Sequence, residues 1–130
     1  MERTIRILHL EDNSADAELI RETILQQGVA CELKLVRSRD EFHASLDPSK
    51  IDVILSDFGL PSYSGIDALK IVRQIDPDLP FILISGTLGE EQAVESLKLG
   101  ANDYILKNRL HRLGPAITRA VREFEEKIKR

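Results

Sequence analysis

Residues 51–61 read IDVILSDFGLP, and this stretch decides the fold class. Its centre, Val53-Ile54-Leu55, is apolar without interruption. A short unbroken apolar run bounded by polar and turn-forming residues is typical of a parallel strand that is buried on both faces. The run leads into Asp57, and Gly59 and Pro61 then predict a loop. The stretch therefore predicts a buried parallel strand that carries a carboxylate at its carboxyl end.

Strand-like runs and helix-like segments alternate along the rest of the chain. Short apolar runs predict further strands at residues 5–10, 33–36, 81–84 and 104–106. Apolar residues spaced three or four apart predict a helix after each strand: one carrying Ala17, Ile20 and Ile24 and ended by Gly28, then residues 39–46, 66–75 and 90–99, and a last helix after residue 110. This alternation predicts an α/β fold with five βα units on an open, doubly wound parallel sheet. Because Lys34 makes the second strand more polar, we expect that strand near an edge.

The start of the last helix is left open by its sequence. Its apolar residues keep a helical spacing from Leu110 to Ile128, but Gly114-Pro115 interrupts the pattern. Either the helix begins at Pro115, since proline is favoured at the first helical position, or it begins earlier and bends there.

Length and composition limit the function classes. The chain has 130 residues, of which 42% are hydrophobic and 31% charged, so we expect one globular domain, residues 1–130, with no effector domain. With 18 basic and 22 acidic residues the net charge is −4, which gives no general basic field for nucleic acid or an anionic membrane. The apolar runs are far shorter than the ~20 residues of a membrane span, and no basic leader precedes one. We therefore expect a cytoplasmic protein.

Cysteine and histidine give weak signals. The single cysteine, Cys31, cannot form an internal disulfide, and we expect it to pack as a small apolar residue. The three histidines, His9, His43 and His111, include no pair with metal-ligand spacing, so each is expected to be structural or solvated.

Polar side chains follow four of the predicted strands. Glu11 and Asp12 follow the first strand, Asp57 the third, Ser85 the fourth and Lys107 the fifth. The carboxyl ends of parallel strands meet at one rim of the sheet, where open α/β sheets place their functional groups. We therefore expect these side chains to lie close together.

Three neighbouring carboxylates repel one another, so they would either take up protons or require a cation. Mg²⁺ suits them, because it takes oxygen ligands and keeps several waters, so that Asp12 and Asp57 suffice for direct contact. Neighbouring residues on a strand point to opposite faces, so Glu11 and Asp12 can share the ion only where the chain leaves the strand. We expect Glu11 to act through water.

An aspartate beside Mg²⁺ can attack phosphorus and form an aspartyl phosphate. Lys107 would then pair with a phosphoryl oxygen and the Ser85 hydroxyl would donate to another. Taken singly, each residue also has a simpler interpretation. Asp12 would belong to a helix cap, Asp57 and Ser85-Gly86 would form turns, and Lys107 would be a solvated surface charge. Their joint placement at matching strand ends favours a site.

At these residues the chain resembles the receiver domain of two-component response regulators. The resemblance covers essentially the whole chain and rests on four stretches: Glu11-Asp12-Asn13, Asp57-Phe58-Gly59-Leu60-Pro61 followed by Gly65, Ser85, and residues 100–107 (GANDYILK). It implies a flavodoxin-like sheet of strand order 2-1-3-4-5. It also implies a partner histidine kinase or phosphotransfer protein, and a signalling domain that assists only its own phosphorylation and dephosphorylation rather than an enzyme.

The resemblance carries roles over position by position. Asp57 is similar to the phosphoacceptor and Lys107 to its ion-pair partner. Ser85 and Tyr104 match the hydroxyl and aromatic switch residues, and the Mg²⁺ site would comprise Glu11, Asp12, Asp57 and the Gly59 carbonyl. Phosphorylation would change the face formed by the fourth helix, fifth strand and fifth helix, which would meet a partner or a second copy.

The chain departs from the family pattern at Asn108 and at Gly86, which follows Ser85 where the family commonly has alanine. Asn108 follows Lys107 where the family usually has proline, so we expect a trans peptide bond there. Gly59 offers no side chain to position or obstruct an attacking water, so the phosphoryl lifetime is expected to rest more on Thr87.

Two other function classes stay open as alternatives. One is a Mg²⁺-dependent phosphohydrolase acting through an aspartyl phosphate on an external substrate. Such enzymes commonly carry a second acid two residues after the nucleophile, where this chain has Gly59. The other is a flavin- or nucleotide-binding module, which is disfavoured because no glycine-rich phosphate loop follows the first strand. The stretch from Ser85 to Glu123 is most similar to receivers of hybrid kinases and multidomain regulators, so we expect the chain to be part of such a protein.

Overall fold

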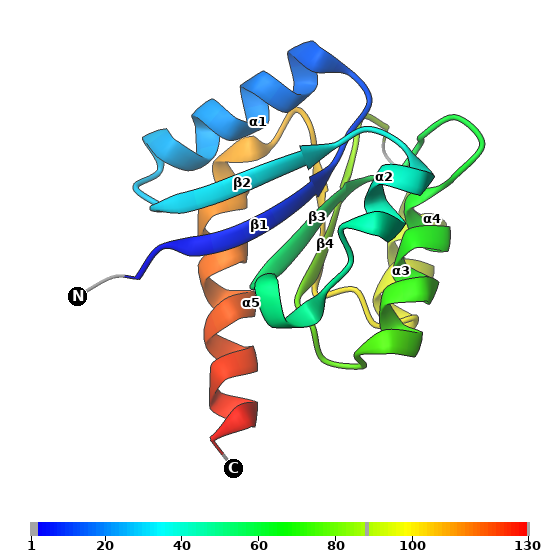
Figure 1. Cartoon of the computed structure of the whole chain (residues 1–130). Coiled ribbons are helices and arrows are strands. Elements are labelled where there is room, and N and C mark those ends of the chain that lie inside the picture. Colours follow the sequence, from blue (N-terminus) through cyan, green and yellow to red (C-terminus); the bar gives the residue numbers. More distant parts are fainter. Residues whose placement is uncertain (1–2, 88, 130) are drawn as a thin grey trace.

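The computed structural model describes residues 3–87 and 89–129, which form one five-stranded parallel sheet with helices on both faces (Figure 1). The strand order is β2-β1-β3-β4-β5, which confirms the expected order and the edge position of β2. The strands are β1 (Ile5–Leu10), β2 (Cys31–Val36), β3 (Val53–Asp57), β4 (Phe81–Ser85) and β5 (Asp103–Leu106). The helices are α1 (Ser14–Gln26), α2 (Arg39–Ala44), α3 (Gly65–Ile75), α4 (Glu90–Lys98) and α5 (Leu113–Ile128).

Side-chain hydrogen bonds cap the starts of α1 and α3, whereas α4 and α5 begin without a side-chain cap. The Asn13 side chain accepts a hydrogen bond from the Asp16 amide at the start of α1, and Ser64 forms a capping box with Asp67 at the start of α3. Gly28 and Gly100 follow α1 and α4 with φ of 82° and 106°, a conformation that glycine adopts without strain. The helix end predicted at Gly28 is therefore present.

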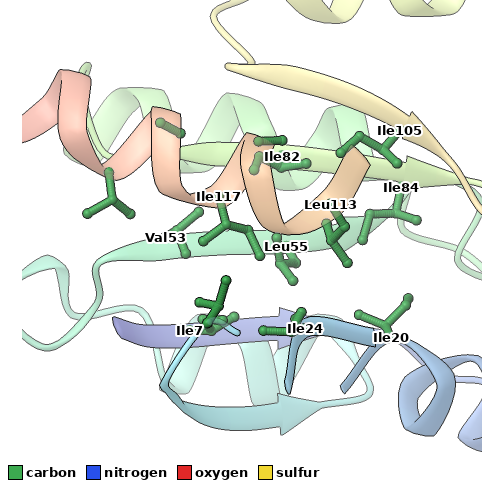
Figure 2. Close-up of a cluster of buried hydrophobic side chains, with 14 residues drawn as sticks. Ile7, Ile20, Ile24, Val53, Leu55, Ile82, Ile84, Ile105, Leu113 and Ile117 are labelled. Carbon is green, nitrogen blue, oxygen red and sulfur yellow. The ribbon is translucent and has the colours of Figure 1, made fainter. Parts of the chain in front are cut away.

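The sheet separates two apolar cores. On one face, α1 and α5 cover a cluster that includes Ile7, Leu55 and Ile84 (Figure 2). On the other face, the second cluster draws on α2, α3 and their neighbouring loops and includes Phe42 and Phe81. Every residue of β3 and β4 is buried, as the unbroken apolar runs predict. Because residues alternate along a strand, Asp57 continues the row of Val53 and Leu55 toward the α1 and α5 side.

Several element boundaries differ from the sequence expectation. β3 continues two residues past Leu55, because Ser56 and Asp57 still pair with Leu10 and Ile84. β2 begins at Cys31, whose backbone is in register with Ile5.

The expected helix at residues 39–46 ends at Ala44, and a short 3₁₀ turn, Pro48–Lys50, follows it. α5 begins at Leu113, after a 3₁₀ turn at Leu110–Arg112. Of the two starts that the sequence leaves open, the one before Pro115 is therefore confirmed. Pro115 is tolerated because the first-turn amides of a helix have no intrahelical acceptor.

Cys31 and the histidines lie as expected from their contexts. Cys31 is a free, partly buried residue packed against the α1 and α5 core. His9 is fully buried, His43 is hydrogen-bonded to Tyr63 over 2.8 Å, and His111 is exposed. Within residues 3–87 and 89–129, no helix is long and apolar enough to cross a bilayer.

A charged network joins the start of β1 to the residue before β3, at the amino ends of these two strands. The buried carboxylate of Asp52 accepts hydrogen bonds from the Arg6 amide (2.7 Å), the Arg6 guanidinium (3.1 Å) and the Arg3 guanidinium (3.0 Å). Burial alone would raise the pKa of Asp52, but these bonds outweigh it and lower the pKa to about 2. A depressed carboxyl pKa stabilises the fold above the pKa of the unfolded chain.

We expect Asp52→Asn to lower the free energy of unfolding at pH 7 by about 1–2 kcal/mol, since both arginines are half-exposed. In the parent chain this contribution is lost as the pH falls from about 3.8 toward 2, whereas the variant lacks that step. Urea unfolding of both proteins between pH 5 and pH 2.5 measures it. Parallel pH profiles would contradict the role of Asp52.

Candidate functional site

The carboxyl ends of β1, β3, β4 and β5 bring distant residues to one rim of the sheet. Pairing of Leu10 with Ser56, of Asp57 with Ile84 and of Ser85 with Leu106 aligns these strand ends. β1 ends at Leu10, so Glu11 and Asp12 both lie where the chain has left the strand. The structure thus places the polar residues that follow the strands together.

The three acids predicted to share a cation lie next to one another. One carboxylate oxygen each from Glu11, Asp12 and Asp57 lies within 4.8 Å of the other two. Glu11 is 1% exposed and Asp57 is 8% exposed, whereas Asp12 is open to solvent. Oxygen donors in a compact group suit a hard divalent cation.

Glu11 is the most deeply buried acid of the group, so its negative charge has the largest desolvation penalty. Burial raises its pKa, although the hydrogen bond from the Asn13 amide and the ion pair with Lys107 act in the opposite direction. The Asn13 amide donates to Oε2 over 3.1 Å. Oε1 is buried, lies 3.0 Å from the Lys107 ammonium, and accepts no well-aligned hydrogen bond from the described residues. This oxygen keeps a lone pair available for a cation.

The Lys107 ammonium lies among carboxylates from three elements. Its Nζ is 3.1 Å from Asp57 Oδ1, 3.0 Å from Glu11 Oε1 and 2.7 Å from Asp16 Oδ2. Burial would lower the pKa of Lys107, but the hydrogen bond to Asp16 and the ion pairs with Glu11 and Asp57 outweigh it and raise the pKa. The ammonium is therefore fully charged at neutral pH. The peptide bond to Asn108 is trans, as expected.

Asp16 is the residue that the sequence analysis missed. An acid in the first turn of a helix is common because it complements the helix dipole, so its presence in α1 gave no distinct signal. The available signal was position: α1 starts only four residues after β1 ends, so its first turn lies at the same rim (Figure 1).

Ser85 is at the rim, but its hydroxyl is bonded within its own loop. The hydroxyl donates to the Thr87 carbonyl over 3.1 Å and accepts from the Thr87 amide over 3.2 Å. Ser85 is buried and Thr87 is exposed. The expected contact of Ser85 with a phosphoryl group thus requires this hydroxyl to leave Thr87.

Tyr104 and Gly59 flank the strand end of Asp57. The Tyr104 ring packs edge-on against Phe58, with 5.9 Å between ring centroids, and its hydroxyl oxygen is buried without a hydrogen-bond partner among the described residues. Gly59 is exposed, and an added Cβ would meet no atom within 4 Å. At Gly65, in contrast, a Cβ would come within 2.8 Å of the Asp57 carbonyl oxygen. Glycine at 65 lets α3 begin against the backbone that carries Asp57.

The chain is similar to known proteins in sequence and in fold. A model of the response regulator receiver domain matches residues 7–118. The chemotaxis protein CheY of Thermotoga maritima is 31% identical over 104 residues, covering 78% of this chain and 84% of that protein. The cell cycle transcriptional regulator CtrA of Caulobacter vibrioides is 33% identical over 106 residues, covering 79% of this chain but 44% of the regulator. The match thus spans less than half of that regulator's length.

A solved structure gives the same result for the fold. A response regulator receiver domain protein from Clostridium thermocellum has a TM-score of 0.81 and 26% identity, covering 97% of this chain and 99% of that one. The family model, the sequence relative and the solved structure agree with one another. The chain belongs to the response regulator receiver domain family, the phosphorelay signalling domains of two-component systems.

Proposed function

We propose that this receiver domain accepts a phosphoryl group on Asp57 from the phosphohistidine of a histidine kinase or a phosphotransfer protein. The observation that carries the proposal is the position of the Asp57 carboxylate. It is nearly buried, within 4.8 Å of oxygens of Glu11 and Asp12, and 3.1 Å from the Lys107 ammonium. A carboxylate among groups that neutralise phosphoryl charge is suited to in-line attack on phosphorus.

The transfer conserves atoms and charge in one displacement. An Asp57 oxygen forms a bond to phosphorus, the bond from phosphorus to the donor nitrogen breaks, and its electron pair returns to the donor imidazole. The Lys107 ammonium pairs with a phosphoryl oxygen during the step.

Glu11, Asp12, Asp57 and the Gly59 carbonyl would hold a magnesium ion. The buried lone pair on Glu11 Oε1 and the all-oxygen donor set support this assignment. Bound Mg²⁺ would offset negative charge on the phosphoryl oxygens. The protein side of the site orients Asp57, keeps Glu11 buried and leaves Asp12 open to the entering donor.

The output would be a conformational change at the α4, β5 and α5 face. Phosphorylation adds about −1.5 to −2 charge, which would draw the Ser85 hydroxyl from Thr87. That movement changes the packing around Tyr104, whose buried hydroxyl has no partner among the described residues. Val94 and Leu97 of α4 are about half exposed and would contribute apolar surface to a partner or a second copy.

We also propose that residues 1–130 form one receiver domain, since a single sheet joins all five βα units.

The number of phosphoryl groups bound per chain distinguishes this proposal from hydrolysis of an external substrate. The chain is incubated with MgCl₂ and acetyl phosphate, and intact mass and released phosphate are followed together. We expect one phosphoryl group per chain, no adduct with a chelator, and no turnover of unrelated phosphomonoesters. Sustained release from a phosphomonoester without a dominant adduct would instead support the phosphohydrolase.

The open space at Gly59 allows a test of phosphoryl lifetime. We expect Gly59→Asn to leave stability unchanged, since its Cβ has room, and to speed loss of the phosphoryl group by roughly threefold to tenfold, because an amide there can position water. Thr87→Ala is expected to change the same rate. The decay of the adduct after donor removal measures both, and unchanged decay in both variants would remove the assignment.

A further inference from the structure

The contacts of Lys107 divide into two kinds. An ammonium has three N–H donors, and here three carboxylates lie within 3.1 Å of Nζ. Glu11 and Asp57 are also members of the group that would hold a divalent cation. Asp16 does not belong to that group, comes from α1, and makes the shortest of the three contacts at 2.7 Å.

Binding of a divalent cation and phosphorylation of Asp57 would weaken the contacts of Lys107 with Glu11 and Asp57. Glu11 and Asp57 would turn oxygens toward a bound divalent cation, and that cation repels the nearby ammonium. When Asp57 becomes an acyl phosphate, its carboxyl group loses its own negative charge. Asp16 keeps its charge in both events, so its attraction for the Lys107 ammonium persists.

We propose that Asp16 is a positioning residue, which holds the Lys107 ammonium beside Asp57 while a divalent cation occupies the site. The proposal rests on phosphorylation of Asp57. It deepens that function, because Lys107 can assist transfer only if it stays near the entering phosphoryl group. Lys107 already reaches Asp16 and Asp57 at the same time, so the contact with Asp16 does not require Lys107 to leave Asp57. One donor can pass from Asp57 to a phosphoryl oxygen while another stays on Asp16.

The location of Asp16 fits this role. Its side chain is 35% exposed, whereas that of Glu11 is 1% exposed, so Asp16 carries its charge at a smaller desolvation cost. It stands in the first turn of α1, where the Asn13 cap fixes the backbone by accepting from the Asp16 amide over 2.9 Å. The helix thus holds this carboxylate at a fixed place beside the rim.

Kinetics of phosphorylation with acetyl phosphate at saturating MgCl₂ test the proposal. We compare the parent chain with Asp16→Asn, which keeps the shape of the side chain, and with Glu18→Gln, which removes the same charge from an exposed position of α1. Asp16→Asn should lower the maximal rate by about tenfold with an unchanged KM for the donor, as expected for a misplaced catalytic group. Glu18→Gln should match the parent.

A second measurement reports on Lys107 directly and needs no phosphodonor. The proton–nitrogen NMR signal of the Lys107 ammonium should stay protected from exchange when MgCl₂ is added to the parent or to Glu18→Gln. In Asp16→Asn it should be lost on MgCl₂ addition.

The outcomes separate the two proposals. A maximal rate in Asp16→Asn equal to or above that of Glu18→Gln, or an ammonium signal that survives MgCl₂ in Asp16→Asn, would overturn the role of Asp16. Absence of any adduct on the folded parent chain would instead overturn phosphorylation of Asp57, while the NMR comparison would still test whether Asp16 holds Lys107.

Discussion

Lys107→Met is expected to lower the free energy of unfolding by about 2–3 kcal/mol at pH 7, because it leaves the buried charge of Glu11 without its cation. The loss should shrink toward pH 5. Without the ammonium the pKa of the buried Glu11 carboxyl rises further above its unfolded value, so the folded variant is destabilised above that pKa and recovers as the carboxyl takes up a proton. Phosphoryl transfer to the variant should also slow strongly, since the Lys107 ammonium lies 3.1 Å from the Asp57 carboxylate.

Urea unfolding at pH 5 and pH 7 measures the stability, with Lys127→Met as the matched control. Lys127 forms an exposed ion pair with Asp78 over 3.2 Å, and its loss should cost less than about 1 kcal/mol. Equal effects of the two substitutions, or a loss in Lys107→Met that does not depend on pH, would contradict a buried charge cluster held by Lys107.

Asp12→Asn is expected to remove most of the stabilisation of the chain by magnesium. In the presence of a chelator the variant should be as stable as the parent or more stable, because it removes repulsion among Glu11, Asp12 and Asp57. Added MgCl₂ should stabilise the parent by about 1–3 kcal/mol at concentrations well above the dissociation constant, and the variant far less.

Thermal unfolding with MgCl₂ and with KCl of equal ionic strength distinguishes binding from screening. Asp40→Asn, which removes an exposed acid from α2, is the control for the loss of charge. Stabilisation by MgCl₂ that is equal in the parent and in Asp12→Asn would show that this carboxylate is not a ligand.

The fold could be predicted from the sequence because the apolar pattern of a strand depends on whether the strand is central or at an edge of the sheet. The unbroken run Val53-Ile54-Leu55 is buried on both faces, and the more polar strand with Lys34 is at the edge. The strand order came with the resemblance to receivers. The rim residues could be grouped because parallel strands place their carboxyl ends together, which is a property of topology rather than of side-chain detail.

The contacts between individual side chains were harder to predict from the sequence. Asp16 gave no distinct signal, because first-turn acids are common on any helix; only its contact with Lys107 shows what it does. The Ser85 hydroxyl was expected to face a phosphoryl group, but it donates to the Thr87 carbonyl, a contact that depends on the atomic geometry of the loop. The end of α2 at Ala44 depends on the turn that follows it, whereas apolar spacing continues to Leu46.

Localisation of the phosphoryl group tests the central claim most directly. The parent chain and Asp57→Asn are incubated with MgCl₂ and acetyl phosphate, and intact mass is followed by peptide mapping of the adduct. We predict one phosphoryl group on the peptide that contains Asp57 and none on Asp57→Asn. An adduct that persists in Asp57→Asn, or its absence from the folded parent chain, would contradict the assignment of Asp57 as the phosphoacceptor.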